Sequence, residues 1–217
     1  MRNHKTAIII IGSILLLSVL FYFIPINRII GSLPIIKRFY NNTTLEIVLQ
    51  NGKAKIWIDG KEYGETPQEI ENLREGEYTI ELEKITSGEA FYKKQTFKIP
   101  LYKNTSSRID LEIGPENILH GSIMYYSPEP KISASEGFLT VTSNAQKAKL
   151  YVDDEYLNDL PITEVKLKEN QYQIKITALG YMDVEVPVII RKGYLLNLKV
   201  FNFPIPVNFD NVEDTNE

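Results

Sequence analysis

The residue types that most often carry catalysis are few in this sequence and far apart. Its two histidines are His4, close to the N-terminus, and His120, near the middle of the chain, and there is no cysteine. Without cysteine, disulfides, thiolate zinc sites and thiol nucleophiles are excluded. A general-base histidine needs an orienting partner nearby, so we expect a surface or linker role for His120. No serine lies in a Gly-x-Ser-x-Gly motif, the elbow that exposes a serine nucleophile.

Two groups of carboxylates could do chemistry in another setting. Glu77, Glu81 and Glu83 share one face of a predicted strand, but they alternate with apolar residues as a solvated face does, whereas a glycosidase pair lies in a cleft. The run 153–155, with Asp159, could hold calcium, but it lacks the spaced ligands of a calcium loop and is typical of a polar hairpin tip. The sequence therefore predicts no catalytic residue, no metal, no cofactor and no enzyme activity.

Trp57 and Tyr63 are the candidate ligand or partner face. Exposed aromatic rings near one another can stack on sugar rings or engage a partner protein. The alternative is that Trp57 covers an exposed sheet face or packs on the neighbouring strand. Both interpretations place the two residues on a β-sheet.

The elements that must position these residues are predicted to be strands. Apolar residues recur at every second position in 54–58, 78–83, 108–113, 172–177 and 196–200. Period-two alternation with one polar face is typical of antiparallel sheets that pack on one side. Asp59-Gly60 follows the first run, and this dipeptide favours a two-residue hairpin in which both central residues have positive φ.

The chain contains one internal repeat. A shift of 94 positions aligns residues 45–84 with residues 139–178 without a gap. Matched pairs include Pro67 with Pro161 and Tyr78 with Tyr172. Self-similarity of this kind is the signature of one structural unit used twice.

An apolar segment precedes both repeats. Residues 7–24 are uncharged and follow Arg2 and Lys5, and their length is sufficient for a membrane-spanning helix. A cleavable signal peptide is the alternative, but no small-residue cleavage pattern follows the segment. Basic residues flank it on both sides, so the positive-inside rule alone gives no orientation. After residue 38 the chain holds 19 basic and 28 acidic residues, a net charge of −9, which disfavours nucleic-acid binding.

We therefore predict an all-β fold class, with two tandem small antiparallel β-sandwich domains preceded by one N-terminal transmembrane helix. Pro115, Pro128 and Pro130 suggest a linker between the domains, although residues 121–126 could pair as an edge strand. The predicted segments are a cytoplasmic N-terminus (1–6), the transmembrane helix (7–24), a juxtamembrane stalk (25–43), a first β domain (44–114), the linker (115–136), a second β domain (137–206) and a disordered acidic tail (207–217).

The first repeat resembles a PEGA domain. That family's pattern is a small residue before a strand, an Asp-Gly hairpin, a Gly-x-Thr-Pro motif and a later glycine before a strand that carries His or Tyr. Residues 51–67 read NGKAKIWIDGKEYGETP. The matching positions are Asp59, Gly60, Gly64, Thr66, Pro67 and Gly76.

The second repeat departs from this pattern. Asp153-Asp154 replaces Asp-Gly, residues 158–161 replace Gly-x-Thr-Pro, and Asn170 replaces the later glycine. It does carry Gly180-Tyr181, a pair that family members often have near their middle. The resemblance spans residues 44–205.

The resemblance implies small extracytoplasmic β-sandwich modules of bacteria and archaea, often tandem and tethered to a membrane, without established catalytic residues. It marks fold positions: Gly60 and Gly64 for backbone angles, Pro67 for a rigid turn, and Asp59 for a side-chain bond to the backbone within its turn. We expect a cell-membrane protein, N-terminus inside, that binds a protein as a scaffold. The alternative is a carbohydrate or cell-wall binding module that uses the exposed aromatics.

Overall fold

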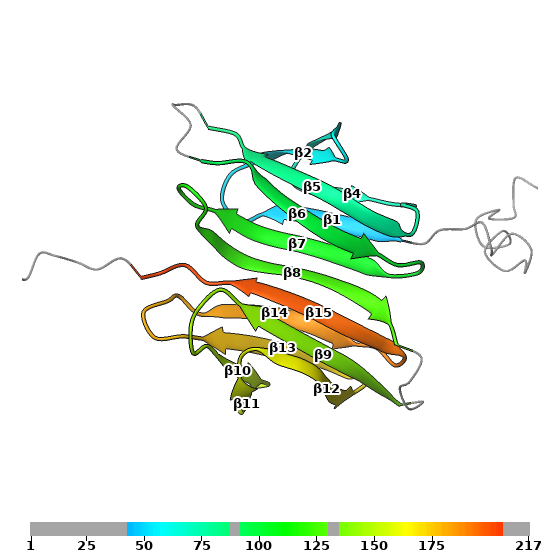
Figure 1. Cartoon of the computed structure of the whole chain (residues 1–217), viewed down its shortest axis with the longest axis vertical. Coiled ribbons are helices and arrows are strands. Elements are labelled where there is room, and N and C mark those ends of the chain that lie inside the picture. The colour runs from blue at the N-terminus through cyan, green and yellow to red at the C-terminus, as the bar shows by residue number, and fades with distance from the viewer. Residues whose placement is uncertain (1–42, 87–91, 130–134, 206–217) are drawn as a thin grey trace, which may run out of the picture. The chain divides into compact units, whose positions relative to one another are not determined.

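The computed structural model describes residues 43–86, 92–129 and 135–205 of the chain, and within these ranges it contains fifteen strands and no helix (Figure 1). The first repeat supplies β1 (Thr44–Leu49), β2 (Ala54–Ile58), β3 (Lys61–Glu65), β4 (Gln68–Ile70), β5 (Gly76–Lys84), β6 (Gln95–Leu101) and β7 (Ser106–Ile113). β8 (Leu119–Pro128) follows it. The second repeat supplies β9 (Glu136–Ser143), β10 (Lys149–Val152), β11 (Glu155–Asp159), β12 (Ile162–Lys168), β13 (Asn170–Thr177), β14 (Val184–Ile190) and β15 (Tyr194–Phe201).

The all-β prediction and the tandem repeat are confirmed by these strands. Alternation of apolar and polar residues becomes alternation of burial, as in β7, where Ile109, Leu111 and Ile113 are fully buried and the residues between them are partly exposed. Within the described ranges, the structure has no helix long and apolar enough to cross a membrane. The predicted N-terminus, transmembrane helix, stalk up to residue 42 and acidic tail lie outside the described residues.

The strands form one large sheet and two small ones. The large sheet has seven strands in the order β12-β9-β15-β8-β7-β1-β4, and the small sheets have four each, β3-β2-β5-β6 and β11-β10-β13-β14. Two pairs of the large sheet, β1 with β7 and β9 with β15, are parallel, so the prediction of purely antiparallel sheets was wrong. A parallel pair needs a long crossover connection, and the strands of each small sheet supply it.

The predicted linker at 115–136 was also wrong, because it contains β8. This strand pairs antiparallel with β7 of the first repeat and with β15 of the second. It is therefore an interior strand that joins the two repeats into one sheet. Thr43, assigned to the stalk, belongs to the first domain, since it is buried and its hydroxyl donates to the Tyr102 carbonyl at 3.1 Å.

The two small sheets pack on opposite faces of the large sheet. On β8, Ile123 joins the core of the first repeat, whereas Met124 and Tyr126 belong to the core of the second. Because successive residues of a strand point to opposite faces, the two cores lie on opposite sides of this strand. Both cores lie in the same compact unit of the chain.

Candidate functional site

The Asp59-Gly60 turn joins β2 to β3 and has the geometry that the sequence predicted. Asp59 has φ 50° and Gly60 has φ 78°, as a two-residue hairpin turn requires. The Asp59 carboxylate accepts a hydrogen bond from the Thr79 N–H at 2.8 Å, and the Asp59 N–H donates to the Thr79 carbonyl at 2.8 Å. The expected side-chain bond therefore leaves the turn and ties it to β5.

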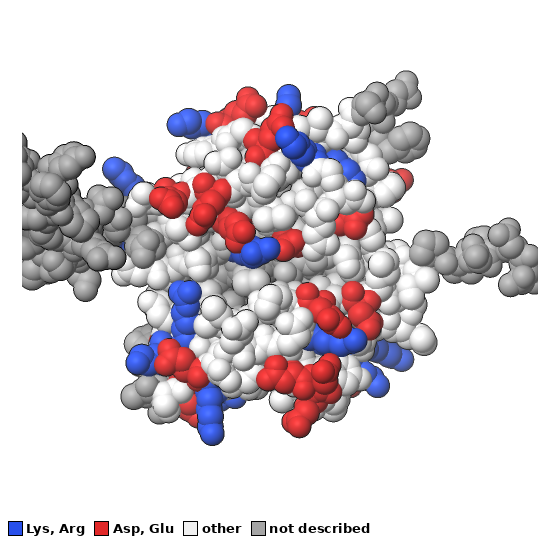
Figure 2. All heavy atoms as spheres, turned by 180° about the vertical axis from the view of Figure 1, so that it is seen from behind, with Lys and Arg blue, Asp and Glu red and all other residues white. Residues whose placement is uncertain are grey.

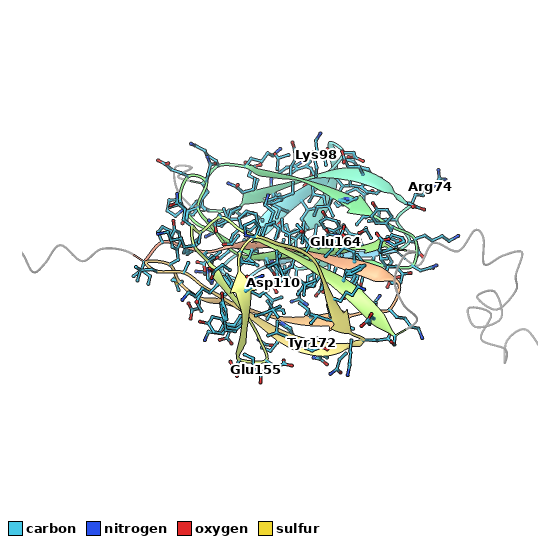
Figure 3. The ribbon with its side chains drawn as sticks, turned by 60° about the horizontal axis from the view of Figure 1, so that its bottom comes forward. Arg74, Lys98, Asp110, Glu155, Glu164 and Tyr172 are labelled. Carbon is cyan, nitrogen blue, oxygen red and sulfur yellow. The ribbon has the colours of Figure 1, made fainter. Side chains whose placement is uncertain are left out.

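The second repeat builds the same turn without glycine. Asp153 has φ 50° and Asp154 has φ 66°, and the Asp153 carboxylate accepts from the Gln173 N–H at 2.8 Å. Glu155 follows at the outer tip of this hairpin (Figure 3). Among the described residues, no group of three or more His, Cys, Asp or Glu side chains is arranged to hold a metal ion.

The remaining turn positions divide into two kinds. Gly64 has φ 98° and lies at a β-bulge between β2 and β3, and Gly180 has φ 80° in the β13–β14 turn, where Tyr181 pairs with Pro204. Gly76 needs no special backbone angle, because its φ is not positive. Gly64 and Gly180 therefore shape turns, whereas Gly76 begins strand β5.

Thr66 and Pro67 close the first repeat's hairpin onto β2. The Thr66 hydroxyl is buried and accepts a hydrogen bond from the Ala54 N–H at 2.9 Å, while the Thr66 N–H donates to the Ala54 carbonyl at 2.9 Å. Pro67 is exposed. Leu160, the counterpart of Thr66, keeps only the backbone bond, to Ala148 at 2.8 Å.

Gly60 gives the first testable prediction. An added Cβ at Gly60 would meet nothing within 4 Å, so only backbone strain opposes a side chain there. We expect Gly60→Asn to be tolerated, as Asp154 is at the equivalent position, and Gly60→Val to cost about 1–3 kcal/mol, because a β-branched residue at positive φ is strained. Thermal melts of the two variants test this, and equal melting temperatures would contradict the turn assignment.

The structure does not bring Trp57 and Tyr63 together as one platform. Trp57 lies between the buried Ile56 and Ile58 and points to the outer face of its sheet, with the Lys94 ammonium 4.1 Å from its ring centroid. Tyr63 packs against the core of the first repeat instead. Lys94 also forms a 2.9 Å ion pair with Glu81, so Trp57 covers a sheet face and packs beside a neighbouring ion pair.

His120 lies on β8 rather than in a linker. Its Nδ1 accepts a hydrogen bond of 3.4 Å from the Phe203 N–H, and the two rings are 5.2 Å apart. Partial burial lowers its pKa, against the opposing charge of Glu112. The ring is thus neutral near pH 7 and holds the segment after β15, which gives it a structural role.

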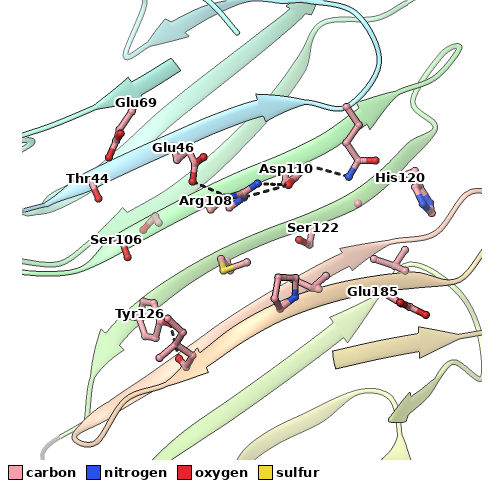
Figure 4. A pocket seen from close by; sticks show the side chains of 18 of the residues that line it. Thr44, Glu46, Glu69, Ser106, Arg108, Asp110, His120, Ser122, Tyr126 and Glu185 are labelled. Atoms are coloured by element: carbon pink, nitrogen blue, oxygen red, sulfur yellow. Dashed lines mark hydrogen bonds and ion pairs between the residues drawn. The ribbon is translucent and has the colours of Figure 1, made fainter. Parts of the chain in front are cut away.

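A groove of about 510 Å³ lies between the repeats. We call it the acidic groove. Its floor is the face of β4, β1, β7 and β8 that points away from the first repeat's core, and its wall is β14, an outer strand of the second repeat's small sheet (Figure 4). Its charged lining residues are Glu46, Glu69, Arg108, Asp110, Glu185 and Arg191.

Arg108 lies at the centre of the groove floor. Its guanidinium forms a 3.0 Å ion pair with Glu46 and a 2.7 Å ion pair with Asp110 (Figure 4). Partial burial by itself would lower the pKa of Arg108, but the hydrogen bond and charge of Asp110, with those of Glu46, raise it. Figure 2, which shows the molecule from behind the view of Figure 1, has a basic group flanked by acidic groups near its middle. The side chain of Arg108 is therefore held in place by two carboxylates of the protein itself, those of Glu46 and Asp110.

Tyr126 and Arg191 close one end of the acidic groove. The Tyr126 hydroxyl donates to the Ile189 carbonyl at 2.6 Å, and the Arg191 guanidinium lies 4.7 Å from the Tyr126 ring centroid. Burial raises the pKa of Tyr126, and the charge of Arg191 opposes this. The phenol therefore stays protonated and fixes β14 against β8.

A second groove, of about 390 Å³, has the reverse composition, and we call it the basic groove. Its wall is β6, an outer strand of the first repeat's small sheet, and its floor is formed by β8, β9 and β15. Its charged residues are Lys98 and Lys199. Each repeat thus contributes the wall of one groove and part of the floor of the other.

The sequence patterns did not identify either groove. Arg108 and Glu46 are 62 residues apart, and in sequence each looks like one more polar residue on a solvated strand face. A usable signal was the run 121–127, which contains no charged residue and whose first three residues are all buried in the structure. A strand buried on both faces joins layers rather than bordering them.

The chain belongs to the PEGA domain family. The family model matches residues 42–117 and again residues 136–201, so the resemblance and its tandem arrangement are confirmed. β8 lies in the interval between the two matches. No curated protein sequence matches the chain.

Proposed function

We propose that this protein is a membrane-anchored, extracytoplasmic, non-catalytic scaffold that binds a partner protein. The observation that carries the proposal is the acidic groove, whose floor comes from one repeat and whose wall comes from the other. Neither repeat alone would form it. Because β8 pairs with both repeats, the floor and the wall of the groove are held in a fixed position relative to each other, which favours recognition of a partner of defined shape.

Two features support the location. Residues 7–24 are uncharged and apolar, and their length suits a membrane span. Membership of the family supports an extracytoplasmic position for the two repeats. In this arrangement the repeats act as a tethered body that holds its partner near the cell envelope.

Membrane fractionation tests the anchor. Full-length protein should stay in the membrane fraction after carbonate and high-salt washes, which remove peripheral proteins but do not extract about 18 apolar residues from lipid. Protease added to cells stripped of their outer layers should digest the repeats. A protected C-terminal part would place the repeats in the cytoplasm, and a product lacking residues 1–24 would show a cleaved signal peptide.

Photo-crosslinking in cells tests the binding surface. A photoreactive amino acid in place of Ser106, which lines the acidic groove, should give a discrete crosslinked protein. The matched control replaces Glu83, an exposed residue on the outer face of β5. Crosslinking at the control position alone would move the binding surface to the outer face of the small sheet.

A carbohydrate or cell-wall binding module is the second candidate. Tyr156 is 55% exposed, its ring centroid lies 5.8 Å from that of Tyr151, and its hydroxyl lies 3.1 Å from the Asp159 carboxylate. Aromatic rings beside a hydrogen-bonding carboxylate are suited to sugars. Retention on a cell-wall polysaccharide resin that is lost in Tyr156→Ala, with Trp57→Ala as the comparison, would favour this function.

A further inference from the structure

The wall of the acidic groove is a sheet edge with open backbone groups. β14 pairs with β13 on one side only. The Ile189 carbonyl accepts from the Tyr126 hydroxyl, which belongs to β8, so this carbonyl points away from β13. Backbone groups of alternate residues in an antiparallel strand point to the same side. Pro187 and Glu185 therefore face the groove as well.

The position of Pro187 is consistent with this orientation. Proline has no N–H to donate, so on an edge strand its nitrogen faces away from the neighbouring strand. Within the described part of the chain, no hydrogen bond is formed by four backbone groups along this edge. They are the N–H and the carbonyl of Glu185, the carbonyl of Pro187 and the N–H of Ile189. An extended polypeptide placed here would become the fifth strand of the second small sheet and would lie across the groove floor.

The groove floor sets the chemistry of such a strand. Glu69 and Glu46 are direct cross-strand partners in β4 and β1, and like charges in this position are destabilising. Arg108 neutralises Glu46 on one side only, from β7. A cation above Glu69 would relieve the repulsion. The charged lining residues comprise four carboxylates and two arginines, a net charge of −2.

We propose that the acidic groove captures an extended, lysine- or arginine-bearing segment of a partner protein as a strand added to β14. This inference rests on the proposed function, since it names the partner class for the same groove. The backbone of the segment pairs with Glu185, Pro187 and Ile189. Its basic side chains point to the floor, toward Glu69 and Glu46.

The basic groove supplies an internal comparison. It repeats the architecture, with Pro100 in the wall strand β6, but among the residues that the structure describes its charged lining residues are Lys98 and Lys199. A cationic strand should therefore discriminate between the two grooves by charge. Lys98, labelled in Figure 3, lies on the outer strand of the other small sheet, away from Asp110.

The test uses full-length protein in non-ionic detergent and a blocked eight-residue peptide that alternates lysine and threonine, with binding followed by fluorescence anisotropy. Alternation places all lysines on one face of a strand. Glu69→Gln should weaken binding about fivefold, as loss of a partly exposed ion pair does. Lys98→Gln, in the basic groove, should leave the affinity unchanged. A peptide with glutamate in place of lysine should not bind to the acidic groove.

Backbone methylation tests strand addition itself. In a strand the lysine N–H groups point to one edge and the threonine N–H groups to the other. Methylating one set should therefore reduce affinity about tenfold or more, and methylating the other should have little effect. Equal affinity of the two methylated peptides contradicts the proposal. Pro187→Ala adds an N–H to the edge and should tighten binding about fivefold.

Other occupants give different results. Binding to residues 42–217 but not to the full chain would assign the groove to the chain's own basic residues 25–41. Self-association that the peptide reverses would assign it to a second copy. If the peptide does not bind but the photoreactive residue in place of Ser106 still crosslinks to a protein in cells, the strand proposal is wrong and the scaffold function stands. Loss of crosslinking at both positions would count against the scaffold function instead.

Discussion

Replacing Gly121 with alanine should destabilise the protein by about 3–5 kcal/mol, because backbone strain and a backbone clash add at one position. Gly121 has φ 116° in β8, and a Cβ there would overlap the Asp110 carbonyl and lie 3.1 Å from the Leu111 Cα. Both atoms belong to the β7 backbone, which is held by β1 on its other side. Neither side chains nor solvent can absorb the overlap.

Urea denaturation followed by circular dichroism measures this loss. The matched control is Gly180→Ala, since Gly180 also has positive φ, 80°, but an added Cβ meets nothing within 4 Å. This control should lose only about 1–2 kcal/mol from strain. Equal losses in the two variants would show that β7 and β8 do not approach as closely as described.

A core substitution in the second repeat should destabilise the first repeat equally. Leu139 is fully buried in the second core, and Leu139→Ala should cost about 2–5 kcal/mol. Because β8 pairs with both repeats, we expect them to unfold in one transition. Trp57, the sole tryptophan, lies in the first repeat, so its fluorescence should shift to lower urea together with the circular dichroism signal.

Leu179→Ala is the control for this experiment, because Leu179 is 101% exposed in the second repeat and its removal should change stability little. An unshifted Trp57 transition in Leu139→Ala would mean that the repeats unfold independently. In that case β8 would act as a linker after all.

Period-two alternation was sufficient to predict strands in both repeats because each has one polar face. It failed at β8, where Gly121, Ser122 and Ile123 are buried in succession and no polar face exists to mark a strand. The neighbouring prolines then suggested a linker. The fixed separation of the repeats, and with it both grooves, depends on that strand.

Turn residues were predictable because their constraint is local: Gly60 and Asp59 carry the positive φ in the sequence motif itself. The Trp57–Tyr63 face was not predictable, since the bulge between Ile56 and Trp57 in the β2–β3 pairing places Tyr63 toward the core. Charge pairing across β4, β1 and β7 depends on register between strands distant in sequence. Alternation alone does not supply that register.

The direction of the strands has a mechanical consequence. β1 runs parallel to β7, and β7 and β15 both run antiparallel to β8. Therefore β1 and β15, the first and last strands along the chain, point the same way. The described chain enters at the start of β1 and leaves β15 at the opposite end of the sheet (Figure 1). A pull between the two ends loads the hydrogen bonds across these strands in shear, so that many must break at once. Such a body transmits tension between its ends instead of unzipping strand by strand.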